Sequence, residues 1–214
     1  MISRKIGHTL DSFFYKTKKK FIKREINPDV LTLVGFFLNF IVGYLFYLGV
    51  PLWAGVLIII AGFCDVFDGV IARCERGVTK FGGFIDSVLD RYSDLFHYIG
   101  IALFYAKQGD LTIVWVTLLA ALGAVVIPYT RAKAEAIGIT CQVGMMERGE
   151  RLGMLAIGAL LGLRALSLML ILLAVLNNLT VFQRIYVIWK KTQGTEEMLN
   201  IDIQQVVNGH QQDN

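Results

Sequence analysis

The sequence predicts an all-α integral membrane protein with six transmembrane helices and an N-terminal amphipathic juxtamembrane helix. Three observations support this prediction. The 214 residues are 55% hydrophobic, and the mean hydropathy of +0.57 lies well above that of an ordinary soluble domain. Apolar runs recur six times along the chain, and basic residues gather in the segments between them on one side.

The apolar runs divide the chain into three parts. The expected spans are roughly Val30–Val50, Leu52–Arg73, Phe81–Ala106, Leu111–Tyr129, Leu152–Leu163 and Leu166–Trp189. The fifth is short unless its helix begins near Glu150. We therefore expect a basic N-terminal segment over 1–29, a six-helix membrane domain over 30–191 and a polar, mobile cytoplasmic tail over 192–214, with a short helix from Glu196 to Val207.

The first 29 residues are basic rather than apolar, so they do not form a cleavable signal peptide. Their apolar side chains are spaced for one face of a helix lying in the membrane interface, with the lysines toward anionic headgroups: Ile6, Leu10, Phe13, Phe14, Phe21 and Ile22. A plain basic tail that only fixes topology is the alternative. Pro28 suits the first turn of the helix that follows.

Basic residues predict the orientation of the chain. Of the 21 Lys and Arg residues, eighteen fall before the first span, in the loops after the second and fourth spans, or near the end of the sixth. Two fall in the opposite loops, and Arg91 lies within the third span. The positive-inside rule then places both termini in the cytoplasm of a multi-pass cell-membrane protein.

Four carboxylates lie within the expected second and third spans, near their cytoplasmic ends: Asp65, Asp68, Asp86 and Asp90. Each ionisable residue at membrane depth costs about 2.5–3.5 kcal/mol, so together they imply a penalty of roughly 10 kcal/mol. Each pair is three or four residues apart and therefore shares one helix face. Two such faces make a cage of oxygen ligands that suits Mg²⁺ or Mn²⁺, with room for two ions.

The run CDVFDGVIARCERGVTKFGGFIDSVLDRYSD, which contains these acids, resembles the signature of the CDP-alcohol phosphotransferases (CDP-alcohol phosphatidyltransferases). Eight fixed positions agree across residues 65–90. The resemblance implies a homodimeric membrane enzyme of phospholipid biosynthesis. Such an enzyme moves a phosphatidyl-type group from CDP-diacylglycerol or a similar CDP-lipid to an alcohol and releases CMP.

Roles follow for the signature residues. The resemblance implies that the first three aspartates bind metal and that Asp90 binds metal or takes the proton from the attacking hydroxyl, which makes Asp90 the expected general base. Small residues let the backbone and base approach closely, and a planar guanidinium suits phosphate, so the expected CDP-lipid-binding residues include Gly69, Ala72, Arg73 and Gly82. The stretch NPDVLTLVG also resembles a family segment that lies near the nucleotide, which adds Asp29 and Thr32.

Two residues extend the face of Asp86 and Asp90 by further helical steps. These are Asp94 and His97. We expect them to support the site by hydrogen bonding rather than to take part directly in catalysis.

Further cations at the cytoplasmic mouth favour an acceptor alcohol that itself bears phosphate. They come from PYTRAKAEAIG, MMERGERLGM and NLTVFQR, which resemble segments of the phosphatidylinositol-phosphate synthases and their archaeal counterparts. That resemblance implies inositol 1-phosphate as the acceptor, held by Arg131, Arg151 and Arg184 with support from Lys133 and Glu135. Positive-inside topology alone is the other explanation of these cations.

Three other functions are compatible with parts of the sequence. Glycerol-3-phosphate, giving phosphatidylglycerophosphate, is the alternative acceptor, and the basic cluster does not separate the two. Serine fits less well, because the extra cations would lack a task. A divalent-cation transporter is the alternative from another class, but the acids are confined to one helix pair near one face, which disfavours a path across the bilayer.

Overall fold

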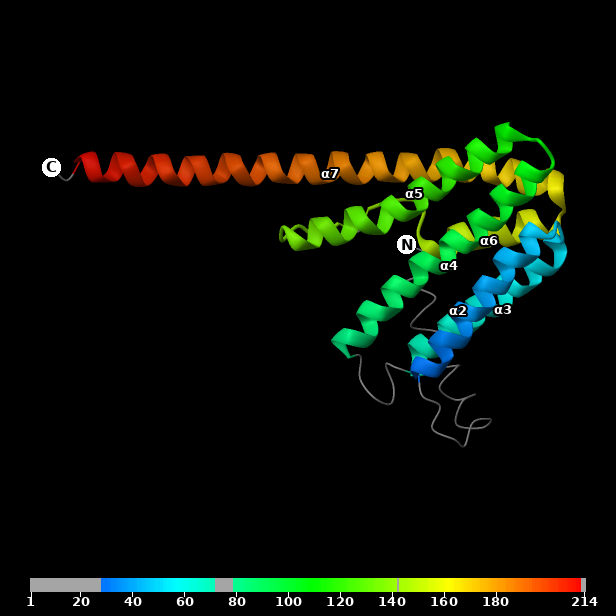
Figure 1. Cartoon of the computed structure of the whole chain (residues 1–214). Helices are drawn as coiled ribbons and strands as arrows, with labels where there is room; N and C mark the ends of the chain where they lie inside the picture. Colours follow the sequence, from blue (N-terminus) through cyan, green and yellow to red (C-terminus); the bar gives the residue numbers. More distant parts are fainter. Residues whose placement is uncertain (1–27, 72–78, 142, 213–214) are drawn as a thin grey trace.

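A computed structural model describes residues 28–71, 79–141 and 143–212, with side chains over 32–63, 79–141 and 143–193. Within these residues the protein is all-helical and contains six helices (Figure 1). They are α2 (Pro28–Tyr47), α3 (Pro51–Ile71), α4 (Lys80–Lys107), α5 (Leu111–Ala136), α6 (Arg148–Leu160) and α7 (Leu163–Gln212).

Local sequence explains where the helices begin. Pro28 and Pro51 each occupy a first helical position, where a missing N–H costs nothing. The Thr79 hydroxyl accepts a hydrogen bond from a first-turn N–H of α4 at 3.0 Å, and the Asp110 carboxylate does the same for α5 at 3.1 Å. Each cap satisfies a backbone donor that would otherwise have no partner within the helix.

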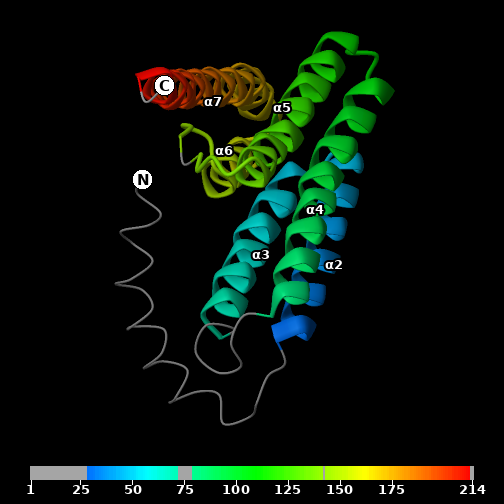
Figure 2. The ribbon, with the colours of Figure 1, turned by 90° about the vertical axis from the view of Figure 1, so that its left-hand side faces the viewer.

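The helices form two groups of three. α2 packs against α3 and α4, and α7 packs against α5 and α6. Contacts of α4 with α5 and of α3 with α6 join the groups (Figure 2). The buried core lies between them and includes Val42, Ile101, Leu155, Leu170 and Leu173, each at most 1% exposed.

Glycines allow the closest helix crossing, between α2 and α4. A Cβ on Gly100 would lie far inside the van der Waals contact distance to the Gly43 carbonyl oxygen, and a Cβ on Gly43 would lie 2.5 Å from the Phe96 carbonyl oxygen. The two backbones are therefore in direct contact. This crossing fixes the position of the α4 residues one and two turns before Gly100, where the polar side chains lie.

The helices agree with the six expected apolar runs, with three differences in length. α5 continues past Tyr129 to Ala136, and α6 begins at Arg148, so the cations expected in loops lie on helices. α7 continues to Gln212 rather than ending near Trp189, and the short helix expected at Glu196–Val207 is part of it. The long end of α7 projects beyond the other helices (Figure 1).

Two helices in the described part of the chain are long and apolar enough to cross a membrane. They are Leu111–Ala136 and the Leu163–Gln193 part of α7. The apolar stretches Thr32–Tyr47 and Pro51–Phe63 are shorter, and α4 carries acidic residues along its first half. Six transmembrane spans thus stay a prediction, whereas the all-helical class is confirmed.

Several expectations fall outside the described residues or side chains. They are residues 1–27 of the amphipathic segment expected over 1–29, and the side chains of Asp29, Asp65, Asp68, Gly69, Ala72 and Arg73. Asp65 and Asp68 belong to the last part of α3, and the end of α3 and the start of α4 lie at the same end of these helices (Figure 2).

Candidate active site

Three carboxylates line one face of α4 at intervals of four residues. Asp86 is exposed and Asp90 is half-buried, whereas Asp94 is only 4% exposed. The face therefore passes from solvent into the bundle within two helical turns. A buried carboxylate needs a counterion and hydrogen bonds, because desolvation disfavours its charge.

The counterions come from the first turn of α6. The Glu150 carboxylate accepts a hydrogen bond from the Glu147 N–H at 3.1 Å, which forms a capping box at the start of the helix. Arg148 and Arg151 follow at a spacing of three, so both project from one face of α6. The sequence ERGER, residues 147–151, thus starts the helix and also places its two guanidinium groups on one face.

Two arginines of α6 pair with two aspartates of α4. Arg151 Nη2 donates to Asp94 Oδ2 at 2.8 Å, and both side chains are almost fully buried, at 3% and 5% exposure. Arg148 Nη1 lies 2.7 Å from Asp90 Oδ1, and its Nε lies 3.5 Å from Asp94 Oδ1. Arg148 therefore bridges the two carboxylates, while Arg151 forms an ion pair with Asp94.

One turn further along α4, His97 is buried and makes a supporting contact. Its Nε2 lies 2.9 Å from Asn39 Oδ1, and Asn39 Nδ2 donates to the Gly35 carbonyl oxygen at 2.9 Å. These bonds tie α4 to α2 beside the glycine crossing. Asp94 and His97 are both hydrogen-bonded, as the sequence predicts, and their supporting role in the site stays a prediction.

Arg184 of α7 is 5% exposed and holds the loop before α6 in place. Its Nε donates to the Val143 carbonyl oxygen at 2.8 Å, and its Nη1 donates to the Ile127 carbonyl oxygen of α5. Gly144 permits this contact. Its φ is +139°, and a Cβ there would lie 2.7 Å from Thr180 Cγ2 and 3.2 Å from Arg184 Nε.

The remaining acceptor candidates lie near the end of α5. Arg131 Nε pairs with Glu135 Oε1 at 2.9 Å, with both side chains more than half exposed, and Lys133 is exposed. The four predicted acceptor residues thus divide into two buried arginines that already contact protein groups and two exposed cations on α5.

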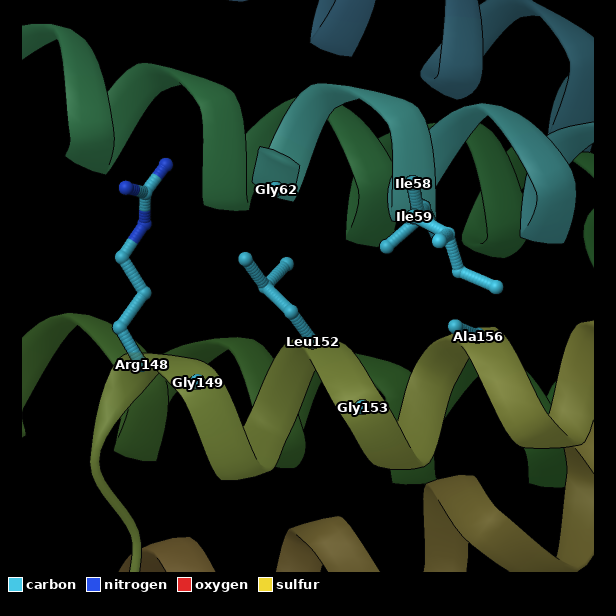
Figure 3. A pocket seen from close by; sticks show the side chains of 8 residues that line it. All are labelled: Ile58, Ile59, Gly62, Arg148, Gly149, Leu152, Gly153 and Ala156. Carbon is cyan, nitrogen blue, oxygen red and sulfur yellow. The ribbon is translucent and has the colours of Figure 1, made fainter. Parts of the chain in front are cut away.

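An apolar groove of about 290 Å³ opens between α3 and α6, beside the charge cluster. Ile58, Ile59 and Gly62 line it from α3, and Arg148, Gly149, Leu152, Gly153 and Ala156 line it from α6. Figure 3 shows Arg148 at one end and the aliphatic side chains along the rest. The glycines of α6 leave the groove open, because a Cβ at Gly149 or Gly153 would meet nothing within 4 Å.

The donors on α4 fit a divalent metal ion in type. Asp86 and Asp90 offer carboxylate oxygens one helical turn apart, the ligands that Mg²⁺ and Mn²⁺ prefer. Among the described side chains, no group of three His, Cys, Asp or Glu residues is placed to hold an ion. The other two expected metal ligands, Asp65 and Asp68, belong to α3, and their side chains lie outside the described part of the chain.

Two predicted CDP-lipid residues are described. Gly82 lies one turn before Asp86, and its N–H donates a hydrogen bond to the Thr79 hydroxyl. Thr32 is half-buried near the start of α2. Sequence reasoning missed the pairing of Arg148 with Asp90 and of Arg151 with Asp94. The sequence shows two acids four apart and two arginines three apart, but the cations of this region were interpreted as ligands of acceptor phosphate or as topology determinants, not as partners of the acids.

Comparison with known proteins gives the family. Residues 25–189 match the CDP-alcohol phosphatidyltransferase family. This chain belongs to that family. As a CDP-alcohol phosphatidyltransferase it is a membrane-associated transferase, and the matched region includes the α3–α4 acids, the α6 arginines and the groove.

Two family members illustrate the similarity, one of them through two crystal structures. Archaetidylinositol phosphate synthase of Pyrococcus horikoshii is 37% identical over 162 residues, which cover 75% of this chain and 82% of that protein. A crystal structure of phosphatidylinositol phosphate synthase of Mycobacterium tuberculosis with CDP-DAG bound superposes with a TM-score of 0.72 at 29% identity, covering 86% and 94% of the two chains. The structure of that enzyme with manganese and citrate gives the same score and identity, covering 86% and 88%.

Proposed function

We propose that the chain transfers a phosphatidyl-type group from a CDP-activated lipid to inositol 1-phosphate and releases CMP. The main support is that acids of the family signature lie next to buried arginines and an apolar groove. The chain is also 37% identical to an archaetidylinositol phosphate synthase. The acids suit the metal-bound diphosphate, the arginines suit the phosphorylated alcohol, and the apolar groove suits the lipid tail.

The reaction requires an attack on the lipid-side phosphorus of the diphosphate. The inositol hydroxyl oxygen forms the new P–O bond, the bond to CMP breaks, and CMP leaves with the electron pair. Asp90 accepts the hydroxyl proton, or holds a metal ion as Asp65, Asp68 and Asp86 do. When bound, two Mg²⁺ or Mn²⁺ ions supply the positive charge that the diphosphate needs; manganese in the tuberculosis enzyme supports a divalent metal.

The groove between α3 and α6 suits the lipid tail of the CDP-lipid. Its walls are aliphatic apart from Arg148, and it ends beside Asp90. A lipid lying there would present its diphosphate to the carboxylates of α4. Gly69, Ala72, Arg73 and Gly82, with Asp29 and Thr32, are the residues that we propose for the nucleotide end.

The acceptor phosphate would be held by Arg131, Lys133, Arg151 and Arg184. Arg151 and Arg184 are buried and fixed by Asp94 and by backbone carbonyls, so little side-chain entropy is lost when phosphate binds their remaining N–H groups. Arg131 and Lys133 lie on the exposed end of α5 and close the site from that side.

We place the chain in the cell membrane with both termini and the site on the cytoplasmic face, as a homodimer. Large apolar side chains facing outward support the membrane placement. Trp115 is 68% exposed and Phe37 is 61% exposed, and soluble monomers rarely expose apolar surface on this scale.

The test is CMP release by the purified full chain with CDP-diacylglycerol and Mg²⁺. The acceptors to compare are inositol 1-phosphate, glycerol-3-phosphate, free inositol and serine. Release with inositol 1-phosphate alone would support both the class and the acceptor. Release only with glycerol-3-phosphate would overturn the acceptor assignment. A CDP-activated ether lipid forms a second donor arm, because the Pyrococcus relative is an archaetidylinositol phosphate synthase.

A further inference from the structure

Arg148 occupies a position between the metal-binding face of α4 and the apolar groove. Its guanidinium reaches Asp90 and Asp94, and the same side chain forms one end of the groove. Of the described residues that line the groove, Arg148 alone carries a charge. Figure 3 shows it leaving α6 at the end where Gly62 and Gly149 face each other.

The two contacts of Arg148 are unequal. The Nη1–Asp90 distance is 2.7 Å, and these side chains are 22% and 21% exposed. The Nε–Asp94 distance is 3.5 Å, and Asp94 has a closer, buried partner in Arg151. Asp94 therefore keeps a counterion whatever Arg148 does, whereas Asp90 has in Arg148 a partly exposed counterion that a stronger cation can displace.

We propose that Arg148 binds the diphosphate of the CDP-lipid, and that metal binding releases it for that task. Asp90 would hold a divalent ion through the carboxylate that now lies 2.7 Å from Arg148 Nη1, while Arg148 Nε would stay near Asp94. With Asp90 engaged in this way, the Nη groups of Arg148 would be able to turn toward the mouth of the groove. This inference rests on the proposed function, because it takes a CDP-lipid as the ligand of the groove.

The chemistry of the ligand fits this position. A CDP-lipid joins an apolar tail to a diphosphate, and the groove joins an aliphatic wall to one guanidinium. Arginine binds phosphate oxygens through two parallel N–H groups. While Arg148 is paired with Asp90, its Nη1 is directed to the carboxylate. Metal and lipid should therefore bind in order, with the metal first.

The first measurement is Mn²⁺ affinity by electron paramagnetic resonance on the full chain, without lipid or acceptor. Arg148→Gln removes the competitor of the metal at Asp90, so the Mn²⁺ dissociation constant should fall about two- to fivefold, the range for a partly exposed ion pair. Arg164→Gln is the matched control. It makes the same change at an exposed arginine near the start of α7 and should leave Mn²⁺ affinity unchanged.

The second measurement is the affinity for CDP-diacylglycerol at saturating Mn²⁺. Arg148→Gln should weaken it about tenfold, since a hydrogen bond to a charged group is lost. Arg148→Lys keeps a cation near the groove but can pair with only one carboxylate. It should restore part of the lipid affinity and leave Mn²⁺ affinity near the wild-type value, because the ammonium can still pair with Asp90. If Arg148→Gln does not fold, Arg148→Met, which also removes the charge, takes its place in both measurements.

The outcomes separate this inference from the proposed function. Unchanged Mn²⁺ affinity in Arg148→Gln, or equal lipid affinity in Arg148→Gln and the wild type, would overturn the inference even if CMP is released normally. Tighter Mn²⁺ binding together with weaker lipid binding would support it even if inositol 1-phosphate proves to be the wrong acceptor.

Discussion

Asp90 and Asp94 lie one turn apart on α4 but have different surroundings. Asp90 is half-buried and shares a partly exposed pair with Arg148, whereas Asp94 is enclosed and bound to Arg151. The first can exchange its partner for a metal ion or a proton. The second cannot do so without leaving Arg151 as an uncompensated buried charge. Their roles in activity and in stability should therefore separate.

Asp90→Asn should nearly abolish turnover, with a loss of at least about 100-fold, the low end for a general base. The amide keeps the size of the side chain and can still accept a hydrogen bond from Arg148, so folding should persist. CMP release and CDP-lipid binding are the two measurements. Turnover above a tenth of the wild-type value would remove Asp90 from the role of base.

Asp94→Asn should mainly reduce stability. It leaves the Arg151 guanidinium, 3% exposed, without a charged partner, at a cost of about 3–5 kcal/mol. The unfolding temperature of the purified protein should fall clearly. Arg131→Gln serves as the control, because a pair this exposed contributes at most about 0.5 kcal/mol. Similar unfolding temperatures for the two variants would contradict the distinction between buried and exposed pairs.

Arg151→Ala tests the acceptor site. It should raise KM for the phosphorylated acceptor far more than KM for the CDP-lipid, because the acceptor phosphate is its proposed ligand. Because this variant also breaks the pair with Asp94, Arg151→Lys is measured beside it. Lysine keeps the charge but not the planar fork. Equal increases in the two KM values would count against acceptor binding.

At the scale of the elements, close contacts between helices set the position of these side chains. α4 meets α2 backbone to backbone at Gly43 and Gly100, and the Asn39–His97 bond lies beside that crossing. Moving α4 outward by an ångström would move every acid on its face relative to α6. Small residues at the crossing therefore affect the geometry of the site from a distance.

Gly100→Ala should lower stability by about 1–3 kcal/mol, the usual cost of overpacking. Its new methyl group would overlap the Gly43 carbonyl oxygen. Gly153→Ala is the comparison, since a Cβ there meets nothing within 4 Å and alanine favours a helix over glycine by about 0.8–1.0 kcal/mol. Thermal unfolding of both variants checks this. A Gly100→Ala protein as stable as Gly153→Ala would show that α2 and α4 can separate without cost.

At the scale of the whole molecule, orientation in the membrane decides which compartment supplies the substrates. The basic residues predict that the α4–α5 connection faces outward and that the end of α5 faces the cytoplasm. In a cysteine-free background, a membrane-impermeant maleimide added to intact cells should label Gln108→Cys. It should not label Ala136→Cys until the cells are opened. The reverse pattern would invert the predicted topology.

The sequence alone determined the helical class, the family and the acids of the signature. Apolar runs report burial in lipid or protein directly, and the eight spaced positions between Asp65 and Asp90 need no knowledge of distant contacts. Helix ends were less certain. α5 and α7 extend further than their apolar runs, because a helix can continue past the point where its side chains cease to be apolar.

Only the tertiary structure decided how the charges pair. Arg148 and Arg151 lie more than fifty residues from Asp90 and Asp94, so no local pattern states which cation meets which acid. The same holds for Arg184, whose partners are backbone carbonyls of α5 and of the loop before α6. Which arginine meets which carboxylate or carbonyl group depends on how α4, α6 and α7 pack. That packing is set by the whole core rather than by any one segment.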